Sequence, residues 1–221
     1  MAHRTRRLRR ALGWLGVPAG LAMAVACGAP QYTYISDSAA NTFFKVPYAW
    51  HKIATSSLAS QLGGGHSALR PGVWETGYDA ASAPSATHVL SPTASRPFAF
   101  ALVFPLSAAA TNALSYNGLR DIVLPVTPAG RQAAASHGFP LTGFHLLRDV
   151  VLMPGQGVHG VRDTFTYSYP NGATDTFDQV AFTNADDTQV YVLLVHCLAT
   201  CYSQYQKEID TVMSSFTVQH P

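Results

Sequence analysis

The clearest pattern of apolar and polar positions lies near the end of the chain. Residues 188–197, "TQVYVLLVHC", form an almost unbroken apolar run rich in Val, which is typical of a strand buried on both faces. Beyond them, apolar residues recur at steps of three and four, as in an amphipathic helix: Tyr202, Tyr205, Ile209, Val212 and Phe216. We expect Thr200 to be the N-cap of this helix. The pattern therefore predicts a buried strand that leads directly into a C-terminal helix.

Three segments with strand patterns precede this unit. Residues 144–153, "FHLLRDVVLM", connect through "PGQG" to residues 158–170, "VHGVRDTFTYSYP", in which aromatic and small polar residues alternate. Residues 174–184, "TDTFDQVAFTN", follow Asn171-Gly172, a strong signal for a tight hairpin turn. The second half of the chain is therefore predicted to be an antiparallel meander closed by the C-terminal helix.

The first half of the chain mixes strand and helix patterns. Strands are expected at residues 43–50, 73–80 and 98–105, and the last of these, "FAFALVFP", has the pattern of a central strand. Helices are expected in three stretches rich in Ala and Ser: residues 53–62, 106–125 and 129–138. The predicted fold class is α+β, an antiparallel β-sheet flanked by helices, with the C-terminal amphipathic helix attached to a central strand.

The N-terminal residues have the pattern of an export signal. A segment rich in arginine precedes residues 11–26, which are uncharged and too few for a membrane-spanning helix of about 20 residues. Cys27 follows directly, an arrangement that resembles the lipobox of bacterial lipoproteins, in which the cysteine is acylated. An ordinary cleaved signal peptide and a retained anchor are the alternatives. We expect a signal peptide over residues 1–26, lipid attachment and a spacer or first edge element over residues 27–42, and a single α+β domain over residues 43–221.

Charge and cysteine content restrict the partner and the compartment. The 221 residues include 14 Lys and Arg against 12 Asp and Glu, but five arginines lie within the first ten residues, so nine basic groups face twelve acidic ones in the remainder. This balance argues against nucleic acid as a partner. Export would place the protein where disulfides persist. With Cys27 acylated, Cys197 and Cys201 remain as a pair, and we predict a disulfide between them; a metal site and a redox pair are the alternatives.

The sequence contains no established catalytic motif. G-x-S-x-G, the P-loop, the dinucleotide fingerprint and HExxH are all missing. The acids of the predicted hairpins are interpreted as solvated edge charges, with an acid–base pair as the alternative: Asp149, Asp163, Asp175 and Asp178. Four histidines are considered as metal ligands but show no i, i+4 spacing: His137, His145, His159 and His196. "GQGVHG" is interpreted as a turn, with an anion-binding nest as the alternative. We predict no catalytic residue, no metal and no cofactor.

The order of these elements resembles the PsbP-like fold, an antiparallel sheet flanked by helices. That fold is shared by a photosystem extrinsic subunit and by actinobacterial cell-envelope lipoproteins of the LpqN type. The resemblance spans residues 40–219 and rests on residues near its two ends: Phe44, Val46, Pro47, Trp50, Ser215, Phe216 and Val218. It implies binding or assembly rather than a defined catalytic activity.

The sequence as a whole predicts an exported protein on the extracytoplasmic face of the cell membrane. Its partners would be the membrane, through a lipid on Cys27, and an unidentified envelope protein or ligand. The expected function is non-catalytic binding or scaffolding. The alternatives are an envelope hydrolase with an unrecognised site, and a carrier that holds an apolar ligand between helices and sheet.

Overall fold

The computed structural model describes residues 30–61 and 71–219, which contain ten strands and five α-helices. The strands are β1 (Tyr32–Asp37), β2 (Thr42–Pro47), β3 (His51–Ile53), β4 (Trp74–Asp79), β5 (Phe98–Pro105), β6 (Thr142–Gly155), β7 (Val158–Ser168), β8 (Thr174–Thr183), β9 (Gln189–Leu198) and β10 (Thr217–Val218). The helices are α1 (Thr55–Gln61), α2 (Ala108–Ala113), α3 (Tyr116–Arg120), α4 (Pro128–Ser136) and α5 (Ala199–Ser214), with the short 3-10 helix η1 (Ala86–His88).

These strands form two antiparallel sheets. The larger has seven strands in the order β3-β4-β5-β9-β8-β7-β6, and the smaller has the order β1-β2-β10. Strands β6 to β9 follow one another in both sequence and space, so the predicted meander is confirmed. Asn171 and Gly172 lie in the β7–β8 turn, as predicted, and Gly172 has a positive φ of 83°.

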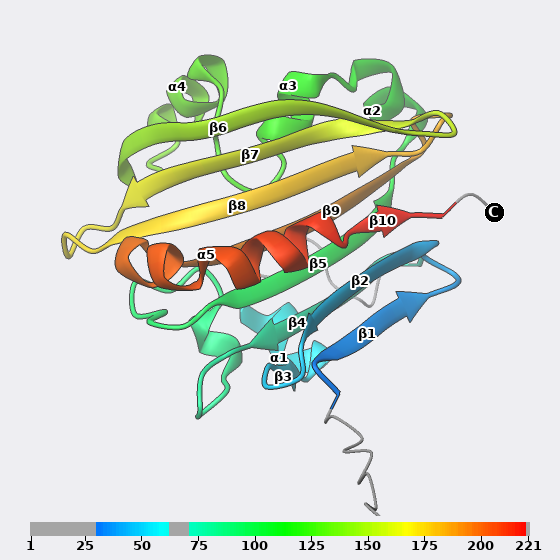
Figure 1. The fold of residues 1–221 in the computed structure, drawn as a ribbon. Helices are drawn as coiled ribbons and strands as arrows, with labels where there is room; N and C mark the ends of the chain where they lie inside the picture. The colour runs from blue at the N-terminus through cyan, green and yellow to red at the C-terminus, as the bar shows by residue number, and fades with distance from the viewer. Residues whose placement is uncertain (1–29, 62–70, 220–221) are drawn as a thin grey trace, which may run out of the picture.

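Both faces of the larger sheet are covered, which gives three layers (Figure 1). Helix α5 and the smaller sheet lie on one face, where Phe44, Trp50 and Ile209 share a buried apolar cluster. Helices α1 to α4 lie on the other face, where Leu58 and Leu119 are buried against β5 and β9. The α+β fold class and the antiparallel sheet flanked by helices are therefore confirmed. The small three-stranded sheet was not predicted.

The C-terminal unit is close to the prediction. Helix α5 packs on β8 and β9. Of the predicted stripe, Ile209 and Val212 are buried in the helix, Tyr202 and Tyr205 are partly buried, and Phe216 is buried just beyond the helix end at Ser214. Cys197 at the end of β9 is joined to Cys201 by a disulfide, as predicted. The predicted N-cap at Thr200 is wrong, because the helix begins at Ala199 and its N-cap position, Leu198, has no capping side chain. The disulfide holds this first turn instead.

Two other details refine the sequence-based expectation. Residues 32–37 form β1, which pairs along β2, so this stretch is the first edge element rather than a spacer. The helix expected within residues 106–125 is two short helices, because Ser107 and Ser115 each cap a separate N-terminus with their hydroxyl groups. Cys27 and the predicted signal peptide lie outside the described residues.

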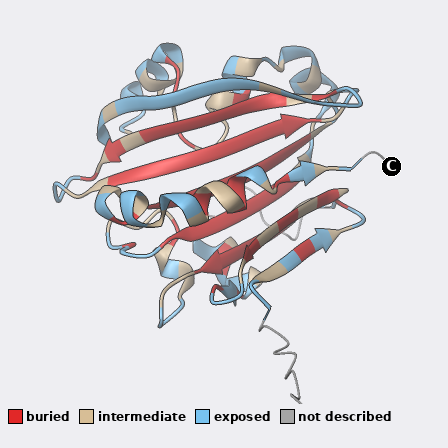
Figure 2. Cartoon of the chain, viewed as in Figure 1, coloured by how far each residue is buried: buried red, intermediate tan, exposed pale blue. Residues whose placement is uncertain are grey.

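Burial is uneven across the larger sheet. Strands β7, β8 and β9 are buried almost throughout because they have neighbours on both sides and layers on both faces (Figure 2). Strand β6 lies at the edge and is exposed along nearly all of its 14 residues. The apolar side chains of β6, which would suit an interior strand, are therefore exposed to solvent.

Candidate functional site

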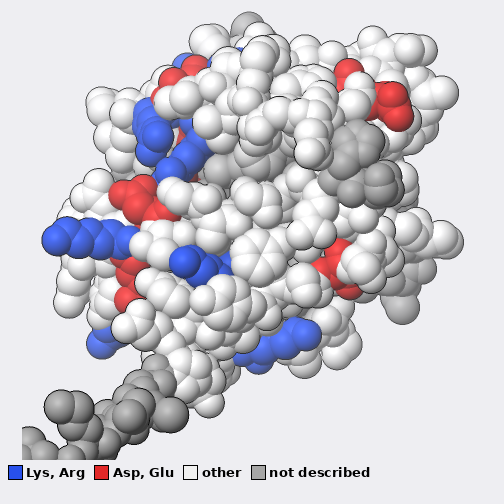
Figure 3. Space-filling model, turned by 45° about the vertical axis from the view of Figure 1, so that its right-hand side comes forward, with Lys and Arg blue, Asp and Glu red and all other residues white. Residues whose placement is uncertain are grey.

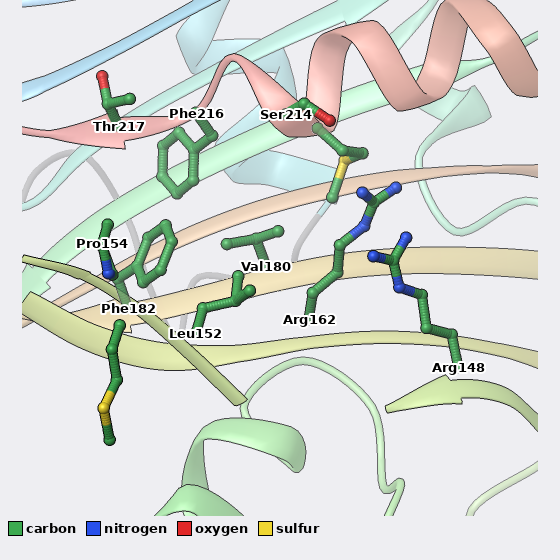
Figure 4. Close-up of a pocket in the computed structure, with 11 residues that line it drawn as sticks. Arg148, Leu152, Pro154, Arg162, Val180, Phe182, Ser214, Phe216 and Thr217 are labelled. Atoms are coloured by element: carbon green, nitrogen blue, oxygen red, sulfur yellow. The ribbon is translucent and has the colours of Figure 1, made fainter. Parts of the chain in front are cut away.

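An open groove lies on the α5 face of the larger sheet, between the end of α5 and the end of β6 (Figure 4). Its volume of about 420 Å³ falls within the range of roughly 300–1,000 Å³ that is usual for ligand sites. Leu152, Met153 and Pro154 form one wall, and Met213 and Phe216 form the other. The groove is therefore bounded by segments about 60 positions apart in the chain.

The floor of the groove is apolar and tightly packed. Val180 and Phe182 point into it from β8, and the Phe182 ring stacks on Phe216 with 5.9 Å between ring centroids. Gly160 lies opposite Phe182 in the sheet, where any side chain would overlap the carbonyl oxygen of Ala181. A Cβ at position 160 would also come within 2.8 Å of Cδ1 of Phe182, so a glycine here leaves room for that ring.

A buried ion pair closes one end of the groove. Arg162 donates to both carboxylate oxygens of Asp178 at 2.9 and 2.7 Å, and also to Asp210 on α5 at 2.7 Å. Burial lowers the pKa of Arg162, but the two carboxylates outweigh it and hold that pKa above its ordinary value. The Tyr202 hydroxyl donates to Asp178 at 2.7 Å. This network attaches α5 to the sheet, so we assign it a structural role rather than a role in binding.

Arg148 is the exposed charge at the mouth of the groove. Its guanidinium points toward the same end as that of Arg162 (Figure 4). Within residues 30–61 and 71–219, Arg148 forms no hydrogen bond or ion pair, whereas Arg162 is fully paired. Most atoms on the face shown in Figure 3 belong to uncharged residues. Arg148 is therefore free to meet a partner.

The edge strand β6 carries the largest exposed apolar side chains near the groove. Met153 is 74% exposed and Leu147 is 53% exposed, and Leu146, Val150 and Val151 are exposed as well. Clusters of this kind are uncommon on the surface of monomeric proteins and usually mark contact sites. Groove and edge together form the candidate functional site.

A histidine–aspartate pair lies deep in the sheet and resembles half of a catalytic triad. His196 Nδ1 is 2.9 Å from Asp175 Oδ2, and both side chains are fully buried. The backbone N–H of Leu90 donates to His196 Nε2 at 3.0 Å, so Nε2 carries no proton and Nδ1 donates to the aspartate. Because Nε2 is already occupied, the ring cannot accept a proton from a nucleophile. The pair stabilises the loop that contains Leu90.

A second acidic cluster lies on the opposite face, beside α3. Asp149 and Asp163 are paired across β6 and β7, as the sequence suggested, and Arg120 donates to Asp149 at 2.9 Å. Arg120 Nε is 3.9 Å from the fully buried Asp163. Burial, followed by the neighbouring charge of Asp149, raises the pKa of Asp163 to about 7. These three side chains do not line the groove beside α5.

The interpretation of the four hairpin acids as solvated edge charges fits Asp149, which is exposed on the edge strand β6, and is wrong for the other three. Asp163, Asp175 and Asp178 are each fully buried, because layers on both faces of β7 and β8 cover positions that alternate between apolar and polar residues. The "GQGVHG" segment is the β6–β7 turn, with Gln156 and Gly157 at positive φ. This outcome confirms the interpretation as a turn.

The histidines considered as ligands do not converge. They lie at the end of α4, on β6, on β7 and inside β9: His137, His145, His159 and His196. Over the described ranges, no three His, Cys, Asp or Glu side chains are placed to hold a metal ion. The residues that sequence reasoning missed are the groove lining and Arg162, which only the packing of α5 brings together.

Comparison with solved structures gives a likeness in fold. The solution structure of cyanobacterial PsbP (CyanoP) from Synechocystis sp. PCC 6803 aligns over 90% of this chain and 98% of its own, with a TM-score of 0.53 and 12% identity. The chain has a PsbP-like fold. This confirms the fold that the sequence resemblance implied. At such low identity, the likeness extends to the fold alone.

Weaker likenesses are found to two further structures. The Ran-binding protein Mog1p of Saccharomyces cerevisiae aligns over 85% of this chain and 95% of its own, with a TM-score of 0.47 and 10% identity. LpqN, described as involved in cell envelope biogenesis of Mycobacterium tuberculosis, aligns over 86% and 91%, with a TM-score of 0.38 and 13% identity. No protein-family model and no curated protein sequence matches the chain. Among the described helices, none is long and apolar enough to span a membrane.

Proposed function

We propose that the protein is an exported cell-envelope protein, anchored by a lipid on Cys27, with a non-catalytic binding or scaffolding role. The observation that carries the proposal is the groove beside α5, which is lined mainly by apolar side chains. Arg148 lies at its mouth and has no ion-pair partner among the described residues. Its occupant would be an apolar segment of an envelope protein that also presents an acidic group to Arg148.

One feature supports the location outside the cytoplasm, and a second supports an orientation in which the groove is accessible. The disulfide between Cys197 and Cys201 is of the kind that persists in oxidising compartments. Pro30, the first described residue, leads into β1, which lies on the side of the molecule away from β6 (Figure 1). A lipid three residues before Pro30 would therefore hold β1 toward the membrane and leave β6 and the groove accessible in the envelope.

The anchor is tested by cell fractionation and metabolic labelling with an alkyne fatty acid. The wild-type chain should be labelled and should stay with membranes after a salt wash, since stable anchoring takes more than one acyl chain. Cys27→Ala should lose both the label and the membrane association. Recovery of an unlabelled wild-type chain with another N-terminus would refute anchoring at Cys27.

The binding role is tested by placing a photo-crosslinking amino acid at Met153, beside the groove. The matched control is Tyr34 on β1, which is also exposed, at 67%, but lies on the other side of the molecule. We expect a discrete protein adduct from Met153 in intact envelopes, and its loss with Arg148→Glu. Equal adducts from both positions, or none from Met153, would contradict the proposal.

A second candidate function is carriage of an apolar ligand, which the volume and apolar lining of the groove favour. In the same experiment, a carrier would give a lipid adduct at Met153 in place of a protein adduct. No described feature favours the hydrolase alternative, since the acceptor nitrogen of the buried His196 is occupied by a backbone N–H.

A further inference from the structure

The unpaired edge of the seven-stranded sheet carries an inference that goes beyond the binding role of the groove. Strand β6 is 14 residues long, and no other strand of the described residues pairs with its outer side. Edge strands of stable monomers are usually protected by charged side chains, above all lysine, by proline, by β-bulges, or by a covering segment. From Thr142 to Met153, β6 contains no lysine and no proline, and its apolar side chains are exposed.

Bulges interrupt β6 at three places but leave one regular stretch. The pairing with β7 shifts near each end and between Leu146 and Arg148, whereas the five residues from Arg148 to Leu152 pair in continuous register. Only such a regular stretch can accept a further strand along its outer edge. Its central residue is Val150.

We propose that β6 pairs antiparallel with β6 of a second copy of this chain, about a twofold axis that passes through Val150. The two seven-stranded sheets then form one continuous sheet. In a twofold contact, a residue i that lies opposite residue j of the second copy implies that j lies opposite i as well. Because residues directly opposite one another share a face of the sheet, i and j are separated by an even number of positions. The axis must therefore pass through a residue rather than between two residues.

The charges of β6 select this register over its neighbours. With the axis at Val150, Arg148 lies opposite the partner's Leu152, and Asp149 lies opposite the partner's Val151. An axis at Arg148 would place two arginines face to face, and an axis at Asp149 would do the same with two carboxylates, both of which are unfavourable. An axis at Val151 or Leu152 would carry the pairing beyond the regular stretch.

The side chains on both faces suit this arrangement. On the α5 face, the two Val150 side chains meet at the axis, flanked on each side by an arginine stem lying against Leu152. On the α3 face, Asp149 is already paired with Arg120 of its own chain, so its approach to the partner's Val151 leaves no charge uncompensated. The exposed apolar groups of the regular stretch are then covered.

Disulfide trapping tests the contact and its register. The full chain is prepared with Cys27→Ser, so that Val150→Cys supplies the only free thiol, since Cys197 and Cys201 are bonded to each other. Opposed residues in an antiparallel pair have Cα atoms about 4.5–5.5 Å apart, within disulfide reach. Mild oxidation should therefore convert Val150→Cys to a dimer on a non-reducing gel. Tyr34→Cys, on the exposed edge strand β1, should form no disulfide-linked dimer and should run as a monomer on the same gel.

The register is tested by Arg148→Cys and Leu152→Cys, each also in the Cys27→Ser chain. Neither variant should form a dimer alone, but a dimer should form when both are co-expressed. Val150→Lys should shift the sedimentation coefficient from dimer to monomer, while Val150→Thr should leave it unchanged. Absence of crosslinking at Val150→Cys, equal crosslinking at Tyr34→Cys, or a monomeric wild type would each overturn the proposal. All of these readouts use purified protein, so they are independent of the envelope experiments above.

Discussion

Replacement of Asp163 by Asn should stabilise the protein at pH 8 and have little effect at pH 4. The Asp163 side chain is fully buried, and burial together with the charge of Asp149 raises its pKa from 3.8 to about 7. Asn has nearly the same shape and stays neutral, so the substitution removes the ionisation and keeps the packing.

The direction of the pH dependence follows from the raised pKa. Between pH 4 and pH 7 the folded protein keeps a proton on Asp163 that the unfolded chain releases, so wild-type stability falls as the pH rises through this window. Above the folded pKa the loss is complete. The difference between 3.8 and about 7, at roughly 1.36 kcal/mol per pKa unit, gives about 4 kcal/mol as the largest advantage of Asp163→Asn at pH 8.

The assay is urea unfolding of both proteins at five pH values from 4 to 8. The difference in unfolding free energy should grow steadily with pH and level off near pH 8. Asp149→Asn is the control, because it removes the neighbouring charge and should move the pH window of the wild-type loss downward. A difference that stays constant from pH 4 to pH 8 would show that Asp163 titrates normally, and would refute the reasoning.

The remaining predictions concern helix α5 and the contacts that attach it to the sheet. Changing Cys197 and Cys201 to Ala should lower the free energy of unfolding by only about 2 kcal/mol, because the closed loop is short, and urea titration with and without reductant measures this. Ile209→Ala should cost more, roughly 2–5 kcal/mol in the same assay, because it leaves a cavity between α5 and the sheet. Asp178→Ala should cost roughly 3–5 kcal/mol, because the buried Arg162 would keep only the partly exposed Asp210 as a charged partner. Asp210→Ala should cost less, because the Asp210 side chain is 44% exposed, and equal costs would contradict the roles assigned to these carboxylates.

Local sequence signals predicted the meander and the C-terminal unit correctly. The Asn171-Gly172 pair specified a hairpin, alternation specified strands on both sides of it, and the stripe from Tyr202 to Phe216 specified α5. The disulfide followed from the spacing and parity of two cysteines. Each of these features depends on residues close together in the chain, so no knowledge of the tertiary arrangement was needed.

The buried charges could not be predicted in this way. Arg162 and Asp178 occupy the polar positions of alternating strands, and such positions normally face solvent. They are buried because α5 returns across this face and contributes Asp210 and Tyr202 to the same network. The position of β6 was hidden for a similar reason, since its apolar sequence suits an interior strand and only the strand order of the whole sheet puts it at the edge.

The distribution of charge supports the proposed pairing through β6. In a chain with few charged residues, several form ion pairs that attach helices to the sheet, such as Arg162 of β7 with Asp210 of α5. Strand β6 contains no Lys, Arg, Asp or Glu other than Arg148 and Asp149, and Asp149 accepts a hydrogen bond from Arg120. Little then opposes the approach of another strand, since the exposed apolar groups gain by burial and Arg148 keeps its guanidinium in water while its stem packs. Adding one ammonium group at Val150 supplies the missing protection, and for that reason Val150→Lys should separate the copies while leaving the fold of each intact.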